Sequence, residues 1–342
     1  MARTTFATGN ALAKKLFEEK LFRDTIKETY WMPRFASKTG DTAIHTKQQF
    51  NKSKGDNITF GIRMRLTGTP RREGEGIEGY EQSLTTHDFS ISLGFYAFAI
   101  RDDGPLSRQR VMFEMDEESQ MAIRDQGAEY IDSLCFDTLE ASPTRLFYRT
   151  SAGNLTTATD ATAKGAITAA DSKITPSLIS FAKTWALTGG NRAQTPLRPI
   201  KVKGRNYIVL MCHPDVIYDL RQDSEWSQAA REALPPGTDH PIFNGAEYLW
   251  DGVVIHSHEN AEIYTNGGSG SNIPGAKLSM FGAQCLCWAW GSRPEVVAEE
   301  FEYKTEHGYA WMFMGAVGKT QFNSLDYGVV HMHVARTQVS DA

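Results

Sequence analysis

Residues 57–100 hold NITFGIRMRL (57–66), TGTPRREGEGIEGYEQ (67–82) and SLTTHDFSISLGFYAFAI (83–100). Apolar and polar residues alternate in the first part, as in a strand with one buried face. The last part is rich in β-branched and aromatic residues and predicts a second strand. Turn-forming and charged residues fill the part between them. The sequence therefore predicts an extended hairpin, which should lie on its own domain or against another chain, because an isolated hairpin is marginal in water.

The tip of this hairpin contains GEGIEG (74–79), which fits the pattern G-x-G-x-x-G of dinucleotide sites. That pattern binds phosphate only between a buried strand and a helix. Here Pro70 and two arginines precede the glycines, and a strand pattern follows them. Glu75 and Glu78 would also place negative charge beside a phosphate. The segment is therefore interpreted as a loop between two strands and not as a nucleotide site.

Length and composition indicate a soluble globular protein. The chain has 342 residues, of which 41% are hydrophobic and 23% charged, enough for two or three domains and a large core. The net charge of −5 gives no general attraction to DNA or to an anionic membrane. Neither a secretory signal nor a membrane span is visible, which predicts synthesis in a cytoplasm. The four cysteines, including Cys285 and Cys287 in a C-x-C pair, are expected to be buried thiols and not zinc ligands.

Residues 10–30 have the spacing of an amphipathic helix. Its apolar positions include Leu12, Leu16, Phe17, Leu21 and Ile26. A polar, irregular stretch follows Pro33, so the helix is expected to be an arm on a tether. It packs either on its own domain or on a neighbouring chain.

Residues 105–141 predict a long helix, which Ser142-Pro143 would end. If it is continuous, it spans about 55 Å at 1.5 Å per residue. Gly127 costs about 1 kcal/mol inside a helix, so two shorter helices broken near it are the other possibility.

The second half of the chain mixes helices and strands. Residues 176–187 predict a helix, 207–212 a short buried strand, and 252–258 another strand. The Ala/Thr-rich segment 150–175 is interpreted as a surface excursion, and the Gly/Ser-rich segment 265–275 as a flexible loop. The C-terminal part is mostly strand, and its alternating aromatic residues, including Trp288 and Trp311, are expected in the core.

Two pairs of histidines raise the possibility of a metal site. His256, His258 and Glu262 fit H-x-H-x3-E, which could complete a facial triad of ligands. The motif resembles the first cupin motif, but the second cupin motif is absent. His331 and His333 form another H-x-H pair. Strand alternation alone also makes paired surface histidines common, and that is the alternative interpretation.

The order of these parts resembles the major capsid protein fold of tailed phages, the Hong Kong 97 type. In detail the sequence is similar to the major capsid proteins of N-four-like podophages. The stretches that carry this likeness are ITFGIRMRLTGTPRREGEGIEG (58–79), YIVLMCHPDVIYDLRQDSEW (207–226), HPIFNGAEYLWDGVVIHSHEN (240–260) and LSMFGAQCLCWAWG (278–291).

The resemblance implies an α+β fold with five parts. These are an N-terminal arm (1–50), an extended β-hairpin called the E-loop (51–100), the spine helix of a P-domain (101–145), a mixed α/β A-domain with low-complexity insertions (146–290), and C-terminal strands that return to the P-domain (291–342).

The implied function is structural. Copies of the chain would assemble as hexamers and pentamers into the icosahedral head shell of a bacteriophage, enclosing double-stranded DNA without sequence-specific binding. The resemblance implies no enzymatic activity, no cofactor and no membrane. It also implies a separate scaffolding protein and a portal, and it allows decoration proteins. Assembly would take place in the cytoplasm of a host bacterium, with a final place in the virion. The alternatives are the shell of a cellular nanocompartment, similar to encapsulin, and a cupin-type metal-dependent enzyme.

Subunit contacts are then expected at the E-loop and the arm. The E-loop candidates combine arginines, glutamates and glycines: Arg63, Arg65, Arg71, Arg72, Glu73, Gly74, Glu75, Gly76, Glu78 and Gly79. Mixed charge favours ion pairs with an adjacent subunit over contact with nucleic acid. The glycines would let the tip fit six-fold and five-fold surroundings. The arm candidates are the five apolar residues of 10–30 named above.

Overall fold

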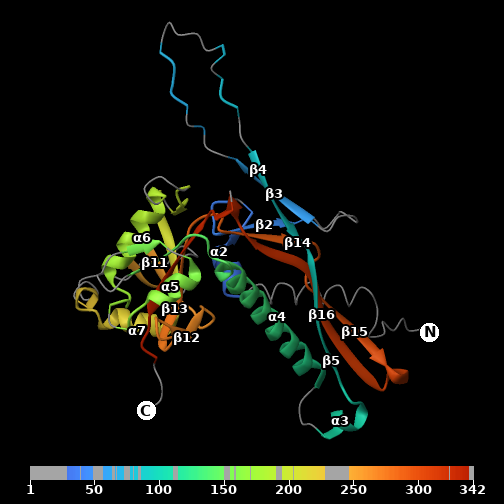
Figure 1. Cartoon of the computed structure of the whole chain (residues 1–342). Helices are drawn as coiled ribbons and strands as arrows, with labels where there is room; N and C mark the ends of the chain where they lie inside the picture. Colours follow the sequence, from blue (N-terminus) through green and yellow to red (C-terminus); the bar gives the residue numbers. More distant parts are fainter. Residues whose placement is uncertain are drawn as a thin grey trace.

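The structure is a computed structural model, and it describes residues 29–38, 40–48, 57–63, 66, 68–72, 78–79, 81–83, 86–110, 115–149, 155–157, 159–169, 171–189, 195–202, 204–227, 246–322 and 324–338. The described strands form a six-stranded sheet, a nine-stranded sheet and two two-stranded ribbons. Figure 1 shows the two large sheets side by side, with the hairpin β3–β4 rising away from them. No helix in these ranges is long and apolar enough to cross a bilayer.

The six-stranded sheet is built from both ends of the chain. Its order is β1-β2-β14-β16-β15, and β5 also pairs with β16. The members are β1 (Ala36–Ser37), β2 (Ile44–Gln48), β5 (Gly94–Arg101), β14 (Leu286–Trp290), β15 (Glu295–Phe301) and β16 (Glu306–Lys319). A short 3-10 turn, η2 (Glu302–Lys304), joins β15 to β16.

One long helix lies along this sheet (Figure 1). It is α4 (Met115–Glu140), and α3 (Pro105–Arg110) precedes it. The sequence left open a break near Gly127, but α4 runs through that residue without interruption. The described part of the expected helix 105–141 consists of α3 and α4, and residues 111–114 between them lie outside the described residues.

The core between α4 and the sheet is rich in aromatic side chains. Trp288, Trp311 and Phe313 are buried there, as their alternation predicted, together with Trp31 and Phe35. The last two come from α2 (Trp31–Phe35), and Ile44 of β2 joins them. The prediction of a polar tether after Pro33 was therefore wrong for this stretch, because a few large apolar residues insert into the core.

The nine-stranded sheet forms the α/β part of the molecule. Its order is β10-β11-β9-β13-β19-β6-β7, with β12 on β13 and β8 on β9. Its strands are β6 (Leu146–Arg149), β7 (Leu155–Thr157), β8 (Ile200–Val202), β9 (Arg205–Cys212), β10 (Ala246–Trp250), β11 (Val253–Ser257), β12 (Ile263–Gly267), β13 (Ile273–Phe281) and β19 (Val329–Ala335). Helices α5 (Asp160–Ala166), α6 (Pro176–Thr188) and α7 (Pro214–Gln222) complete it, and β17 (Gln321–Phe322) and β18 (Leu325–Asp326) form a small ribbon.

Both low-complexity segments are more ordered than the sequence indicated. Strand β7 and helix α5 lie within 150–175, where Ala163, Ile167 and Ile174 are buried. The segment 265–275 spans the turn of the β12–β13 hairpin. At its start, a Cβ on Gly267 would stand 2.6 Å from Ile167 Cδ1. Small residues permit close packing at these points, which composition alone did not distinguish from a loop.

The C-terminal segment is divided between the two large sheets. Strands β15 and β16 lie in the six-stranded sheet, whereas β19 lies between β13 and β6 in the nine-stranded sheet. This differs from the expectation that the whole of 291–342 returns beside the long helix. The other domain boundaries stay a prediction.

Candidate subunit-contact surface

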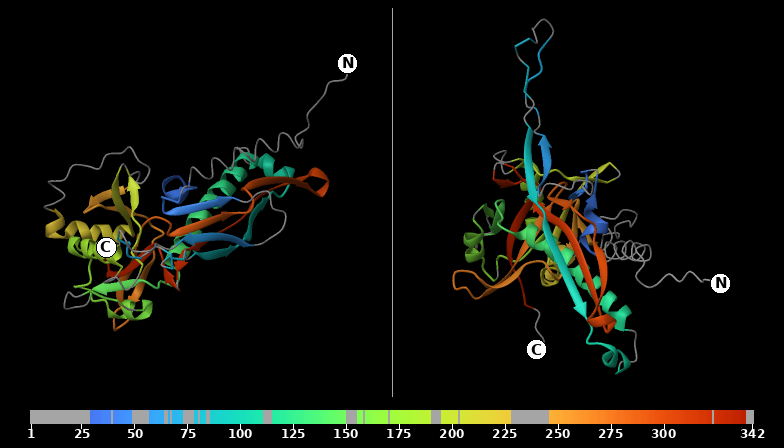
Figure 2. Two further views of the ribbon diagram at one scale, coloured as in Figure 1. Left: turned by 90° about the horizontal axis from the view of Figure 1, so that it is seen from above. Right: turned by 90° about the vertical axis from the view of Figure 1, so that its right-hand side faces the viewer.

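The hairpin consists of β3 (Asn57–Arg63) and β4 (Thr86–Ser92), paired antiparallel from Asn57 with Ser92 to Arg63 with Thr86. The prediction of one strand over 83–100 is corrected to two, since Leu93 separates β4 from β5. The two strands have different partners: β4 pairs with β3, whereas β5 pairs with β16. Figures 1 and 2 show the hairpin continuing the line of β5 outward, beyond both large sheets.

The base of the hairpin is fixed by an apolar contact. Ile58, Phe60 and Ile91 are 2%, 4% and 6% exposed. They pack against three small residues of the six-stranded sheet, Cys287, Ala289 and Ala316, in a cluster of their own. Burial of one such large side chain contributes about 1.5–3 kcal/mol.

This contact uses the face of the sheet that α4 does not cover. Cys287 and Ala289 alternate along β14 with Trp288 and Trp290, which lie in the main core. Alternate residues of a strand point to opposite faces. The small residues therefore leave room for the hairpin on one face, while the tryptophans fill the other.

Gly318 of β16 also sets how closely the hairpin approaches. A Cβ at this position would stand 2.9 Å from Ile91 Cδ1 and 3.1 Å from Phe89 Cε1. Contacts below 3.4 Å require the neighbours to move, so a larger residue would push β4 away from the sheet.

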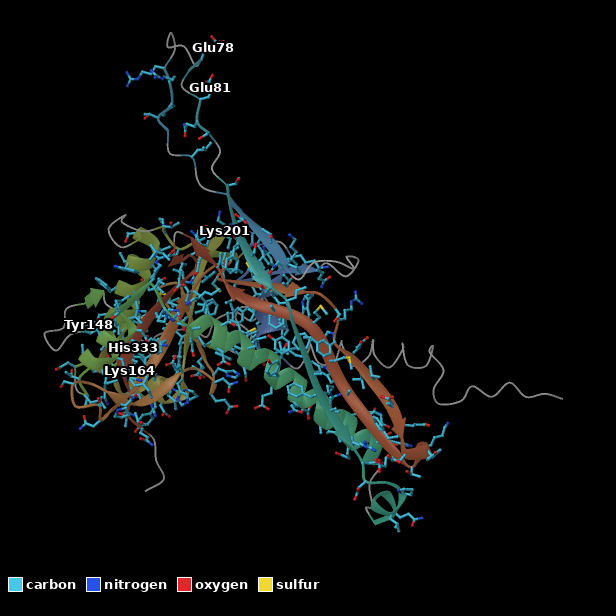
Figure 3. The ribbon with its side chains drawn as sticks, turned by 45° about the vertical axis from the view of Figure 1, so that its right-hand side comes forward. Glu78, Glu81, Tyr148, Lys164, Lys201 and His333 are labelled. Carbon is cyan, nitrogen blue, oxygen red and sulfur yellow. The ribbon has the colours of Figure 1, made fainter. Side chains whose placement is uncertain are left out.

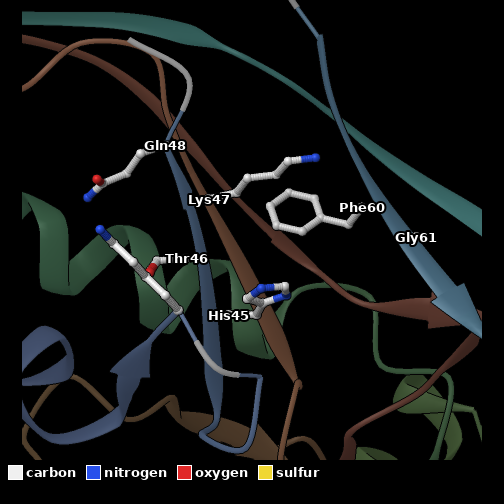
Figure 4. Close-up of a pocket in the computed structure, with 7 residues that line it drawn as sticks. His45, Thr46, Lys47, Gln48, Phe60 and Gly61 are labelled. Atoms are coloured by element: carbon white, nitrogen blue, oxygen red, sulfur yellow. The ribbon is translucent and has the colours of Figure 1, made fainter.

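Polar groups complete the base on the side of β2. Lys47 Nζ donates a hydrogen bond to the carbonyl oxygen of Thr59 at 2.6 Å, and lies 5.6 Å from the centre of the Phe60 ring. Burial and the nearby Lys47 lower the pKa of His45. These residues border an open cavity of about 400 Å³ (Figure 4), lined by Lys38, His45, Thr46, Lys47, Gln48, Phe60 and Gly61.

The tip of the hairpin is exposed and polar where the structure describes it. Arg71, Arg72, Glu78 and Glu81 are all exposed. Figure 3 shows the side chains of Glu78 and Glu81 at the far end of the hairpin, away from both sheets. The surface can therefore offer both signs of charge to another molecule without involving the protein's own core.

Two local hydrogen bonds shape the tip. The Gly68 amide donates to Gln82 Oε1 across the hairpin at 2.9 Å, and the Gly79 amide donates to Glu81 Oε2 at 2.8 Å. Gly79 has φ +86°, a conformation that favours glycine. The chain turns at that residue.

The predicted contact residues divide into described and undescribed ones. Arg71, Arg72, Glu78 and Gly79 lie at the exposed tip, and Arg63 ends β3. Arg65, Glu73, Gly74, Glu75 and Gly76 lie outside the described residues, as do the arm residues Leu12, Leu16, Phe17, Leu21 and Ile26. The sequence missed the anchor made by Cys287, Ala289 and Ala316, although small residues alternating with tryptophans were a signal for it.

The first histidine pair does not form a metal site with Glu262. His256 is buried, with Nδ1 2.8 Å from the Tyr30 hydroxyl. His258 lies beyond the end of β11 and accepts a hydrogen bond from the Asn260 amide at 3.1 Å. Glu262 instead pairs with Lys277. Within the described part of the chain, the ligand atoms of these three residues do not lie close enough together to hold one ion.

The second histidine pair is buried rather than on the surface. His331 lies 3.1 Å from Ser279 Oγ. His333 lies 2.8 Å from the Tyr264 hydroxyl and 3.0 Å from Asp160 Oδ1. Burial lowers the pKa of both histidines. Both are core residues with hydrogen-bond partners, and the interpretation as surface histidines was wrong.

Comparison with known proteins places these features in context. The profile of a family described as phage capsid protein matches residues 5–336. The major capsid protein of Pseudomonas phage KPP25 is 27% identical over 309 residues, covering 76% of this chain and 78% of that protein.

Solved structures show the same fold. The capsid of Ralstonia phage GP4 has a TM-score of 0.80 at 23% identity and covers 100% of both chains. The capsid of cyanophage Pam1 has a TM-score of 0.74 at 19% identity, covering 98% of this chain and 99% of that one. The Hong Kong 97-type fold expected from the sequence is thus confirmed, whereas the finer likeness to N-four-like podophages stays a prediction.

Proposed function

Because the chain belongs to the phage capsid protein family, we propose that its copies assemble as hexamers and pentamers through the tip of the β3–β4 hairpin. The chain is a structural subunit of the icosahedral phage head and part of the virion, and not an enzyme. The proposal concerns which of its surfaces join the copies.

The observation that carries the proposal is the contrast between the two ends of the hairpin. Ile58, Phe60 and Ile91 hold the base on the six-stranded sheet. Arg71, Arg72 and the other described tip residues are exposed. Figure 3 shows Glu78 and Glu81 at the far end of the hairpin, well beyond that sheet. A fixed base and an exposed charged tip suit a projection that reaches a neighbouring copy. Repetition of a weak contact around a closed shell makes it strong.

The charges of the tip favour ion pairs as the contact. Arg71 and Arg72 precede a glutamate-rich stretch that includes Glu78 and Glu81. Complementary charges orient partners and select against wrong ones more than they add affinity. In this proposal the glycines around them let one sequence fit both six-fold and five-fold positions.

The arm and the other partners extend the proposal. The apolar stripe Leu12, Leu16, Phe17, Leu21 and Ile26 would dock on an adjacent copy. Assembly would take place in the host bacterial cytoplasm with a separate scaffolding protein and a portal, and decoration proteins could be added later. A net charge of −5 suits a wall that encloses double-stranded DNA without binding its sequence. The family match favours this role over that of a cellular nanocompartment.

Deletion of residues 68–79 tests the role of the tip. The deleted residues lie in the loop that joins the two strands, beyond their last pair, Arg63 with Thr86. We therefore expect a folded subunit with the same circular dichroism spectrum as the parent. We expect electron microscopy to find no shells or hexamer sheets, under expression conditions in which the parent forms them. Replacement of 68–79 by a Gly/Ser segment of equal length keeps the length of the hairpin but removes the charges of its tip. This variant therefore separates the effect of length from the effect of charge. Normal shells from the deletion would refute the proposed contact.

A further inference from the structure

Three side chains from distant parts of the sequence meet at the outer end of the six-stranded sheet. Asp102 follows β5, His307 is the second residue of β16, and Asp116 is the second residue of α4. Figure 1 shows this end of the molecule beside α3, opposite the α/β part. One donor atom from each of the three lies within 4.8 Å of the other two.

Backbone pairing positions two of these residues. The Asp102 amide donates to the His307 carbonyl oxygen at 3.0 Å, and the His307 amide donates to Asp102 Oδ1 at 2.6 Å. This exchange continues the β5–β16 ladder by one step beyond the pair of Arg101 with Gly308. Asp102 is only 9% exposed. The carboxylate is thus held by the fold and not by a flexible surface side chain.

The third residue approaches from the start of the long helix. Asp116 Oδ2 lies 3.4 Å from His307 Nδ1. This separation is longer than the 2.7–3.2 Å of a good N–H···O hydrogen bond. It matches two ligands of one ion, because metal–ligand bonds of about 2.1 Å at a tetrahedral angle place the ligand atoms about 3.4 Å apart.

We propose that Asp102, Asp116 and His307 form a binding site for a divalent transition-metal ion. One imidazole nitrogen and two carboxylates suit Zn²⁺ or Mn²⁺, whereas Ca²⁺ prefers oxygen ligands alone. The side chains of His307 and Asp116 are 27% and 39% exposed, so an ion can enter from solvent. A fourth position is left for water.

An ion at this site would fasten the start of α4 to the end of the sheet. Two carboxylates so close together repel one another, and a divalent cation would offset that repulsion. The links join positions 102, 116 and 307, so binding should stabilise the folded chain and not only a local turn.

The test uses the full-length unassembled chain after removal of metal with EDTA. We expect calorimetric titration with Zn²⁺, and separately with Mn²⁺, to show one ion bound per chain. We expect thermal unfolding of the metal-bound chain to occur at a higher temperature than that of the metal-free chain. Asp116→Asn and His307→Gln should each weaken binding at least about tenfold. Asp125→Asn at an exposed position of α4, and His213→Gln at the separate His213–Asp215 pair, should leave binding unchanged.

Absorption spectroscopy of bound Co²⁺ provides a second measurement, which does not depend on the stability of the chain. Bound Co²⁺ should show the visible absorption of a site with nitrogen and oxygen ligands, and this absorption should be lost in both site variants. The proposal is overturned if Zn²⁺ and Mn²⁺ fail to bind, if the site variants bind as well as the parent, or if Ca²⁺ binds as tightly as Zn²⁺.

Discussion

The indole ring of Trp311 on β16 occupies the space that a side chain at Gly127 on α4 would need. A Cβ at position 127 would lie 2.7 Å from Cε2 and 2.8 Å from Cζ2 of Trp311. Trp311 is completely buried, so its ring has little room to move. The glycine therefore brings the long helix close to the sheet, and it does not mark a break in the helix.

Gly127→Ala should destabilise the subunit although alanine is the better helix former. The gain in helix propensity is about 1 kcal/mol, whereas overpacking a closed core costs about 1–3 kcal/mol. We expect a net loss of up to about 2 kcal/mol in the free energy of unfolding, measured in urea on the unassembled chain. Gly165→Ala is the matched control, since nothing lies within 4 Å of a Cβ there. A stabilised Gly127→Ala would contradict the tight contact.

Phe60→Ala should loosen the base of the hairpin. Removal of this buried ring from its contact with Cys287, Ala289 and Ala316 costs about 3 kcal/mol. We expect faster amide exchange across β3 and β4, while α4 keeps its protection. Phe95→Ala provides the same chemical change at a site that is 63% exposed. Equal exchange in the two variants would show that the ring does not anchor the hairpin.

Local patterns predicted the elements that carry a regular alternation. The strand beginning at Asn57, the burial of Trp288 and Trp311, and the helix at Pro176–Thr188 all followed from spacing. The stretch after Pro33 has no such period. Its few large residues, Phe35 and Ile44, find their contacts only in the assembled core.

The histidines show why the candidate sites were harder to predict. Tyr30 and His256 are hydrogen-bonded across 226 residues of sequence, and a sequence spacing gives no sign of such a partner. A strand with two histidines raised the possibility of a ligand pair, but the fold buries both rings and gives them Tyr, Ser and Asp hydrogen-bond partners. In contrast, the exposed charges Arg71, Arg72 and Glu78 could be predicted, because turn residues and mixed charge need no distant partner.

Reversing the charge of Arg71 and Arg72 together should weaken assembly without unfolding the subunit. Both side chains are exposed, so Arg71→Glu with Arg72→Glu should leave the free energy of unfolding nearly unchanged. We expect shell formation, followed by light scattering, to require a higher protein concentration. The difference from the parent should shrink at high salt, where exposed ion pairs are screened. Lys201→Glu with Arg205→Glu is the control for a general change of net charge. Unchanged assembly of the Arg71/Arg72 variant would argue against an ion-pair contact at the tip.

Glu140, the last residue of α4, should make the stability of the subunit depend on pH. Burial, and then the charge of Glu262, raise its pKa to about 8, although the Glu262 amide donates to both carboxylate oxygens, at 3.2 and 3.1 Å. Asp137 raises this pKa further, and Lys277 opposes the shift. Between about pH 5 and 8 the folded chain therefore keeps a proton that the unfolded chain has lost. The contribution of Glu140 to the free energy of unfolding therefore falls as pH rises through this range, by at most about 1.4 kcal/mol per pH unit.

Glu140→Gln should remove that dependence, since the amide stays neutral and keeps a carbonyl oxygen for the Glu262 amide. The buried histidines, such as His331 and His333, have lowered pKa values and act in the opposite direction, so the variant is compared with the parent at each pH. We expect the two to unfold alike near pH 5 and the variant to be more stable near pH 8. Glu117→Gln, at an exposed position of the same helix, should follow the parent throughout. If the difference in the free energy of unfolding between Glu140→Gln and the parent stays constant from pH 5 to 8, Glu140 does not hold a proton in the folded chain.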